Sequence, residues 1–77
     1  MSRAQQIRQW LAENPGWHFA ADVCDGLEII AADDRAKHAR SLSNMVTLGL
    51  LDGAGRRRFM KYRANRNAYY RPTEGNA

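Results

Sequence analysis

Residues 49–72, GLLDGAGRRRFMKYRANRNAYYRP, combine a dense positive charge with large apolar side chains. The interleaved rings are not expected of a disordered basic tail, which is poor in aromatic residues, and a targeting signal would leave them unexplained. Residues 57–63 and 68–72 favour β-structure, and ANRN between them has turn chemistry. We therefore predict a β-hairpin in which Tyr62 and Tyr70 pack inward, while Phe59 or Tyr69 is the exposed ring.

A first helix is predicted at residues 2–13, where Ile7, Trp10 and Leu11 recur at helical spacing and Pro15 prevents continuation. Ser2 is in position to cap its start.

A short extended segment, Trp17–Phe19, and a second helix from about Ala20 to Leu27 are expected next. Val23, Leu27 and Cys24 form the expected buried stripe of this helix. Cys24 is therefore interpreted as a small buried side chain.

The third helix is predicted to start with Asp33 or Asp34 as its N-cap, to reach about Leu48 and to stop at Gly49. Its expected apolar stripe comprises His38 (or Ala39), Leu42, Met45 and Leu48. Its opposite, polar face comprises Lys37, Arg40, Ser41 and Asn44.

A length of 77 residues and ordinary fractions of hydrophobic and charged residues fit one small domain. We expect this domain to span residues 1–73, with a flexible tail at 74–77. One cysteine excludes an intrachain disulfide, and the sequence contains no apolar run typical of a signal peptide or a membrane span. A cytoplasmic protein without membrane partners is therefore expected.

The net charge of +4 is unevenly distributed. Residues 1–34 have two arginines and six acids, a net charge of −4, whereas residues 35–71 have ten basic residues and one acid, a net charge of +9. A one-sided positive field attracts polyanions. The charge pattern predicts a nucleic-acid partner and a nucleoid-associated location.

The order helix, short strand, two helices and hairpin is the order of the winged helix-turn-helix family. IRQWLAENPG (7–16) resembles that family's first helix and its stop, and FAADVCDGLEI (19–29) resembles the supporting helix. AKHARSLSNMVTLGLL (36–51) is similar to the recognition helix and the L-x-x-x-G-L signature, and AYYRPT (68–73) is similar to the closing strand of small bacterial and phage regulators. The resemblance implies an α+β, mainly α fold with three helices and a two-stranded wing, sequence-specific binding of double-stranded DNA, and a role as a small transcriptional regulator.

Three departures from that family are visible. IIAADD (29–34) lengthens the connection between the second and third helices, and Glu28 stands where a glycine is common. DGAG (52–55) delays the start of the wing.

On this resemblance the recognition helix, about 34–48, enters the major groove, and the wing, 56–71, lies on the phosphate backbone. The candidate residues of the recognition helix are Arg35, Lys37, Arg40, Ser41 and Asn44, with Arg35 on a phosphate as an alternative to a base edge. The candidate phosphate contacts of the wing are Arg56, Arg57, Arg58, Lys61, Arg63 and Arg66. About five neutralised phosphates predict that log K falls with log salt at a slope of about −4 to −5.

Other chemistry has little support in the sequence. His18 and His38 lack metal-ligand partners at suitable spacing, and Ser41 and Ser43 have no base and acid to activate them. We therefore expect neither an enzyme, nor a metal site, nor a cofactor. Two alternatives stay open, namely a protein-interaction module marked by exposed Trp10, Trp17 or Phe59, and a binder of structured RNA. Whether the protein is a monomer or a homodimer is also left open.

Overall fold

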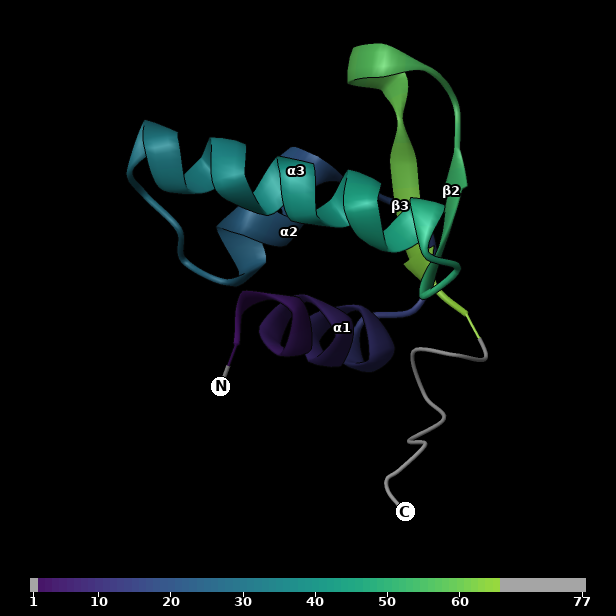
Figure 1. The fold of residues 1–77 in the computed structure, drawn as a ribbon. Helices are drawn as coiled ribbons and strands as arrows, with labels where there is room; N and C mark the ends of the chain where they lie inside the picture. Colours follow the sequence, from purple (N-terminus) through teal and green to yellow (C-terminus); the bar gives the residue numbers. More distant parts are fainter. Residues whose placement is uncertain (1, 66–77) are drawn as a thin grey trace.

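The computed structural model describes residues 2–65, apart from the side chain of Arg58, as a small α+β fold that is mainly helical. In chain order the elements are α1 (Arg3–Glu13), β1 (His18–Phe19), α2 (Ala20–Gly26), α3 (Ala32–Thr47), β2 (Leu51–Ala54), a short 3-10 helix (Arg57–Phe59) and β3 (Lys61–Ala64). Figure 1 shows α1 on one side of α3, α2 behind α3, and the β2–β3 hairpin projecting beyond the helices on the side away from α1.

The three predicted helices are confirmed, with small shifts at their ends. α1 begins with a capping box, because the Ser2 hydroxyl accepts a hydrogen bond from Gln5 N at 3.2 Å and Gln5 Oε1 accepts one from Ser2 N at 2.9 Å. α3 begins at Ala32 with Ala31 as its N-cap, so the prediction of Asp33 or Asp34 as the cap is wrong. Both carboxylates lie in the first turn instead, where they complement the helix dipole.

Both α2 and α3 end in the same hydrogen-bonded motif. At the end of α3, Leu50 N donates to Met45 O at 2.8 Å and Gly49, with a φ of 78°, donates to Val46 O at 3.0 Å. At the end of α2, Ile29 N donates to Cys24 O and Glu28 N to Asp25 O, and Glu28 takes the left-handed conformation with a φ of 61°. The motif turns the side chain of Leu48 away from the core, and Leu48 is 71% exposed. The prediction that Leu48 belongs to the buried stripe of the third helix is therefore wrong.

The strands form a three-stranded antiparallel sheet in the order β1-β3-β2. Tyr62 on β3 is paired with His18 on β1 and with Gly53 on β2. The side chains of Met60 and Val46 pack over β2 at Gly53. A Cβ added to Gly53 would lie 2.7 Å from Met60 Cε. A side chain at position 53 would therefore require Met60 and Val46 to shift.

The hairpin that the structure describes is formed by β2 and β3, and the pairing with residues 51–54 was not predicted. Residues 52–55 are not a delay before the wing, since most of them form β2, and β3 starts only at Lys61 instead of residue 57. Ala64 belongs to β3 and not to a turn. The predicted strand 68–72, Tyr69 and Tyr70, and the tail 74–77 lie outside the described residues.

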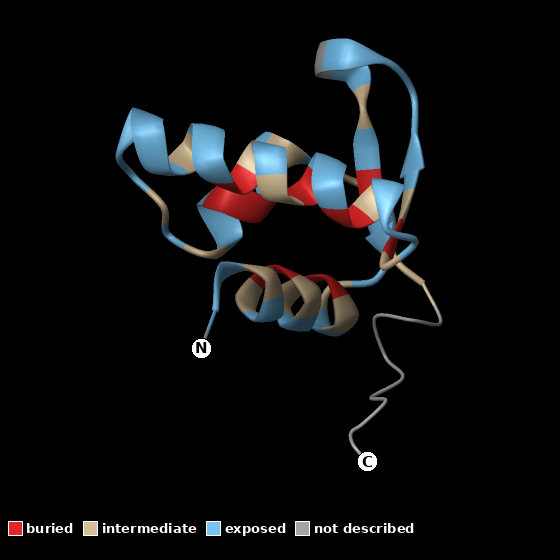
Figure 2. Cartoon of the chain, in the orientation of Figure 1, coloured by how far each residue is buried: buried red, intermediate tan, exposed pale blue. Residues whose placement is uncertain are grey.

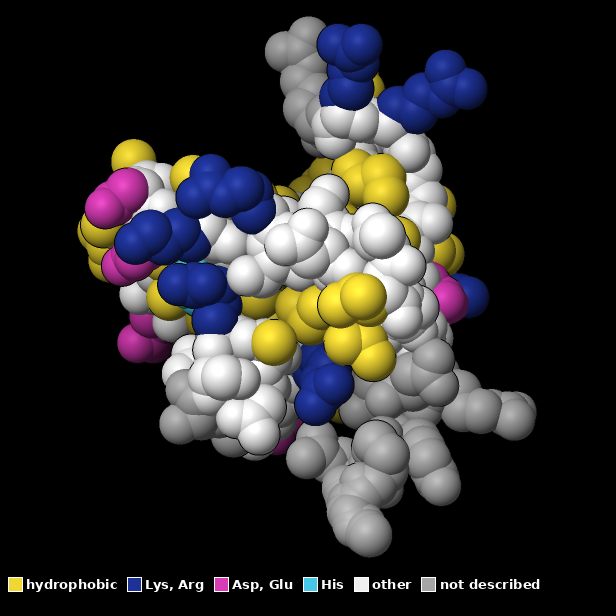
Figure 3. Space-filling view, in the orientation of Figure 1, with side chains coloured by type: hydrophobic (Ala, Val, Ile, Leu, Met, Phe, Trp, Pro, Cys, Tyr) yellow, Lys and Arg dark blue, Asp and Glu magenta, His cyan; other side chains and the backbone are white. Residues whose placement is uncertain are grey.

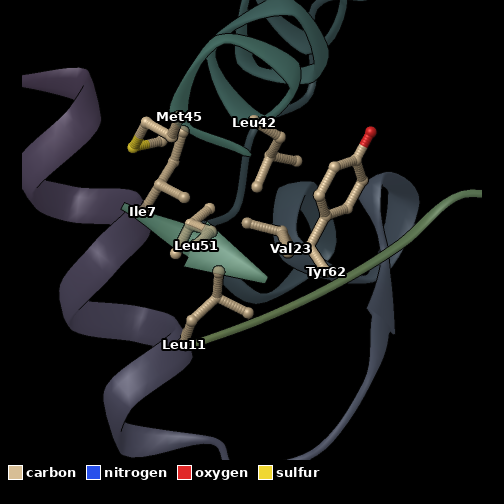
Figure 4. Close-up of a cluster of buried hydrophobic side chains, with 7 residues drawn as sticks. All are labelled: Ile7, Leu11, Val23, Leu42, Met45, Leu51 and Tyr62. Carbon is tan, nitrogen blue, oxygen red and sulfur yellow. The ribbon is translucent and has the colours of Figure 1, made fainter. Parts of the chain in front are cut away.

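The core gathers side chains from every helix and from two strands. Its fully or nearly buried members are Ile7, Leu11, Val23, Leu42, Met45, Leu51 and Tyr62. Figure 4 shows these side chains converging between α1, α3 and the strands, and Figure 2 shows that buried residues line the facing sides of the helices while the end of the hairpin is exposed. Tyr62 packs inward and Phe59 is 67% exposed, which confirms both predictions.

Candidate nucleic-acid interface

The exposed surface of α3 divides into two stripes at helical spacing. His38, Leu42 and Met45 face the core. From the 3.6-residue period, one stripe comprises Ala36, Arg40, Ser43 and Thr47, and the other comprises Lys37, Ser41, Asn44 and Leu48. The first stripe lies on the side of Ala39, which faces the hairpin across a hollow described below.

The structure places the predicted residues of α3 unequally. Lys37, Arg40 and Asn44 are exposed, while Ser41 is half-buried. Of the exposed predicted residues, Arg40 lies nearest the hairpin side of the helix, and Lys37 and Asn44 lie further round it. Ser43 and Thr47, which the sequence analysis did not select, accompany Arg40 on that side.

Arg35 has several partners within the chain. Its Nη1 donates to Asp25 Oδ1 at 3.0 Å and to Ile29 O at 2.7 Å, and its Nη2 donates to Ala21 O at 3.5 Å. Its side chain is 32% exposed and forms an ion pair with Asp25. These contacts fix the start of α3 to α2, and a phosphate at Arg35 would have to compete with them.

The tip of the hairpin, residues 55–60, presents two exposed arginines. Gly55, with a φ of 95°, leaves no room for a Cβ against the Phe59 carbonyl, and Arg57 has a φ of 52°. Arg56 and Arg57 are both exposed at this turn. Figure 3 shows basic side chains at the end of the hairpin and again over α3, on the same side of the molecule. The side chain of Arg58 and all of Arg66 lie outside the described residues.

The outer face of the sheet pairs cations with rings. Lys61 Nζ lies 5.3 Å from the centroid of the Phe19 ring, and the Arg63 guanidinium lies 4.5 Å from the centroid of the Trp17 ring. Arg63 Nε also donates to Asp52 Oδ2 at 2.9 Å, and this bond lowers the pKa of the Asp52 carboxyl below its usual value. Arg63 is thus bound to its neighbours on the sheet, whereas Arg56 and Arg57 project from the tip.

A hollow of about 560 Å³ separates α2 and α3 from the hairpin. Its buried or half-buried lining consists of Ala20, Ala39, Met60 and Tyr62, and its exposed edges consist of Phe19, Ala21, Asp22, Arg57 and Phe59. We call it the apolar hollow. This hollow could not be predicted from the sequence, because its small residues on α2 and α3 fit ordinary helix packing equally well.

The two remaining groups of chemical interest lie inside the fold. His38 is 6% exposed, and its Nδ1 is 2.7 Å from the Asp34 carbonyl, to which it donates. Its buried Nε2 has no hydrogen-bond partner among the residues that the structure describes. Cys24 is buried and burial raises the pKa of its thiol. Within residues 2–65, His, Cys, Asp and Glu side chains form no group that could hold a metal ion, and none of the helices there is long and apolar enough to cross a membrane.

Comparison with known proteins yields no match to this chain, either among family models, among curated proteins or among solved structures. The proposal below therefore depends on the geometry and the charge of the chain alone.

Proposed function

We propose that this protein is a winged-helix protein that binds double-stranded DNA, with α3 in the major groove and the β2–β3 hairpin on the phosphate backbone. The order of elements supports this, since two packed helices are followed directly by an antiparallel hairpin. The sheet supports it as well, because β1 pairs with Lys61 and Tyr62 of β3 and joins the hairpin to the segment that leads into α2. A role as a small transcriptional regulator is part of the same proposal.

The observation on which the proposal depends is the exposure of basic side chains on both α3 and the hairpin tip. α3 exposes Lys37 and Arg40, and the hairpin tip exposes Arg56 and Arg57. Figure 3 shows basic side chains over α3 and at the end of the hairpin in one view of the molecule. B-DNA offers a major groove about 12 Å wide that admits one helix, flanked by phosphates that a neighbouring hairpin can contact. A helix and a hairpin that project together match this arrangement.

The residues divide by the kind of contact that they can make. Arg40 and Asn44 can bond base edges, since arginine binds guanine and asparagine binds adenine through two hydrogen bonds. Arg56 and Arg57 can contact phosphates, which increases affinity without selecting a sequence. Arg35 and Arg63, which have partners in the chain, are proposed to hold α2, α3 and the sheet in place.

Selection of bound sequences from a random duplex pool tests this division. The wild-type protein is expected to enrich a sequence motif. Combined Arg40→Ala and Asn44→Ala should weaken that motif, whereas combined Arg56→Ala and Arg57→Ala should retain it and lower affinity for all duplexes alike. Arg3→Ala, which removes an exposed charge from α1, is the matched control.

The proposal fails if the wild-type protein enriches no duplex sequence and shows no salt-dependent affinity for duplex DNA. A structured RNA that displaces the duplex at equal nucleotide concentration would favour RNA as the ligand instead.

A further inference from the structure

The apolar hollow lies within the proposed interface, yet phosphate binding does not explain it. Phosphates are bound by charged and polar donors, whereas this hollow is lined mostly by alanine, methionine and aromatic side chains. Phe59 at its edge is 67% exposed and Phe19 is 38% exposed. Its volume of about 560 Å³ is within the range of about 300–1,000 Å³ typical of ligand pockets. A surface of this kind fits a bulky apolar group.

The apolar surface continues beyond the hollow. A second hollow of about 370 Å³, lined by Phe19, Ala54, Gly55, Phe59 and Lys61, shares both phenylalanines with the first. The two hollows therefore adjoin across Phe19 and Phe59 and lead toward the outer face of the sheet. Two adjoining hollows form a track that suits an extended segment of a chain better than one compact small molecule.

The charge around this track is positive. Arg57 lies at the edge of the first hollow and Lys61 at the edge of the second. Asp22 also lies at the edge, where its Oδ2 accepts a hydrogen bond from Phe19 N at 2.9 Å, and the two cations and this one carboxylate leave a net charge of +1 around the track. Residues 35–65 have eight basic residues and one acid, a net charge of +7. The complementary partner is therefore acidic.

We propose that the apolar hollow is a docking site for an acidic segment of a partner protein, which inserts one bulky apolar side chain and places its carboxylates near Arg57 and Lys61. Because the hollow separates α3 from the hairpin, such a segment would exclude DNA from the space between them. This second statement rests on the proposed DNA binding, whereas the docking site itself does not.

The test uses the full chain and a short fluorescein-labelled peptide of Asp and Glu with one central Trp. Fluorescence anisotropy is measured without DNA. We expect saturable binding, and at least about tenfold weaker binding when Ala replaces the Trp of the peptide, since burial of a large apolar side chain contributes an effect of this size. A peptide with Lys in place of its acids should not bind.

Ala21→Phe fills the hollow from the exposed start of α2, without altering α3 or the hairpin. It is expected to weaken the peptide at least about tenfold, because the added ring occupies the space of the inserted side chain. Ala32→Phe, the same change at the exposed start of α3, is the matched control and should leave peptide binding unchanged. Circular dichroism of both variants checks that they are folded.

The docking site is overturned if no acidic peptide binds, if the Trp and Ala peptides bind equally, or if folded Ala21→Phe binds like the wild-type protein. It is also overturned if free indole competes as well as the peptide, because the site would then be one for a neutral small molecule. If the peptide binds and duplex DNA does too, but neither displaces the other, the shared surface is refuted. If the peptide binds and DNA does not bind at all, the docking site stands and the proposed function fails.

Discussion

Glu28 adopts a backbone conformation that is usually reserved for glycine. With a φ of 61° it connects α2 to the loop before α3, while Ile29 N and Glu28 N satisfy the last carbonyls of α2. The left-handed conformation costs a non-glycine residue about 1–2 kcal/mol. The glycine that the winged-helix resemblance leads one to expect is thus replaced by a residue in the conformation that glycine favours.

Glu28→Gly is therefore expected to raise the free energy of unfolding by about 0.5–1 kcal/mol, because the relieved strain exceeds the added entropy of the unfolded chain. Urea denaturation followed by circular dichroism measures the change. Glu13→Gly, at the exposed end of α1, is the matched control and should lower the free energy of unfolding by up to about 1 kcal/mol. A loss of stability in Glu28→Gly would show that this backbone conformation is not strained.

At Gly26, in contrast to Glu28, a glycine is favoured because its neighbours leave no room for a side chain. A Cβ at this position would collide with the indole ring of Trp10, whose other contacts include an edge-to-face packing on His18 at 4.9 Å between ring centroids. Alanine normally stabilises a helix relative to glycine by about 0.5–1 kcal/mol. Here the collision is expected to outweigh that gain, since overpacking costs about 1–3 kcal/mol.

Gly26→Ala should thus lower the free energy of unfolding by about 1 kcal/mol, as the difference of these two effects. In a Trp10→Leu background, where the ring is absent, the same change should be neutral or stabilising. Equal effects of Gly26→Ala in both backgrounds, measured as a double-mutant cycle, would contradict the role given to the Trp10 ring.

Among the elements, the helices follow from local signals and the hairpin does not. α1 has its capping box and its apolar stripe within twelve residues of sequence, and Gly49 marks the end of α3. β2, in contrast, has the sequence LDGA, whose Asp and Gly are uncommon in strands. Tertiary contacts account for both, because Asp52 pairs with Arg63 across the sheet and Gly53 admits Met60 and Val46. No local pattern reveals these contacts, and β2 was therefore not predicted from the sequence.

The Asp52–Arg63 pair makes the stability of the hairpin dependent on pH. The hydrogen bond from Arg63 lowers the pKa of Asp52 in the folded protein below the ordinary value of 3.8. The contribution of the Asp52–Arg63 pair to the stability of the fold is fully present above the ordinary pKa of Asp52. It is lost as the pH falls through the lowered pKa of the folded state.

Asp52→Asn should therefore reduce the loss of thermal stability between about pH 5 and about pH 2, because the paired carboxylate can no longer be protonated. The melting temperature as a function of pH measures this loss. Asp33→Asn, which removes an exposed carboxylate from the first turn of α3, is a control for the general effect of charge. If the melting temperatures of the wild type and Asp52→Asn depended on pH in the same way, the Asp52–Arg63 pair would not be formed in solution.

For the molecule as a whole, the distribution of charge follows from the sequence, whereas the residues that form the proposed interface follow from it only in part. The contrast between residues 1–34 and 35–71 is apparent from composition, and the structure then brings α3 and the hairpin tip to one side. Which cations remain available could not be predicted, because Arg35 and Arg63 find their acidic partners, Asp25 and Asp52, only after folding. The apolar hollow likewise arises from three elements that meet in space.

The affinity for duplex DNA as a function of salt concentration tests the central claim most directly. The proposed interface has five exposed cations, namely Lys37, Arg40, Arg56, Arg57 and Lys61. If they neutralise about five phosphate charges, log K should fall with log salt at a slope of about −4 to −5. Combined Arg56→Ala and Arg57→Ala should reduce the steepness by about two, and Arg3→Ala should not alter it. No measurable affinity, or a slope near zero, would contradict a DNA interface formed by α3 and the hairpin.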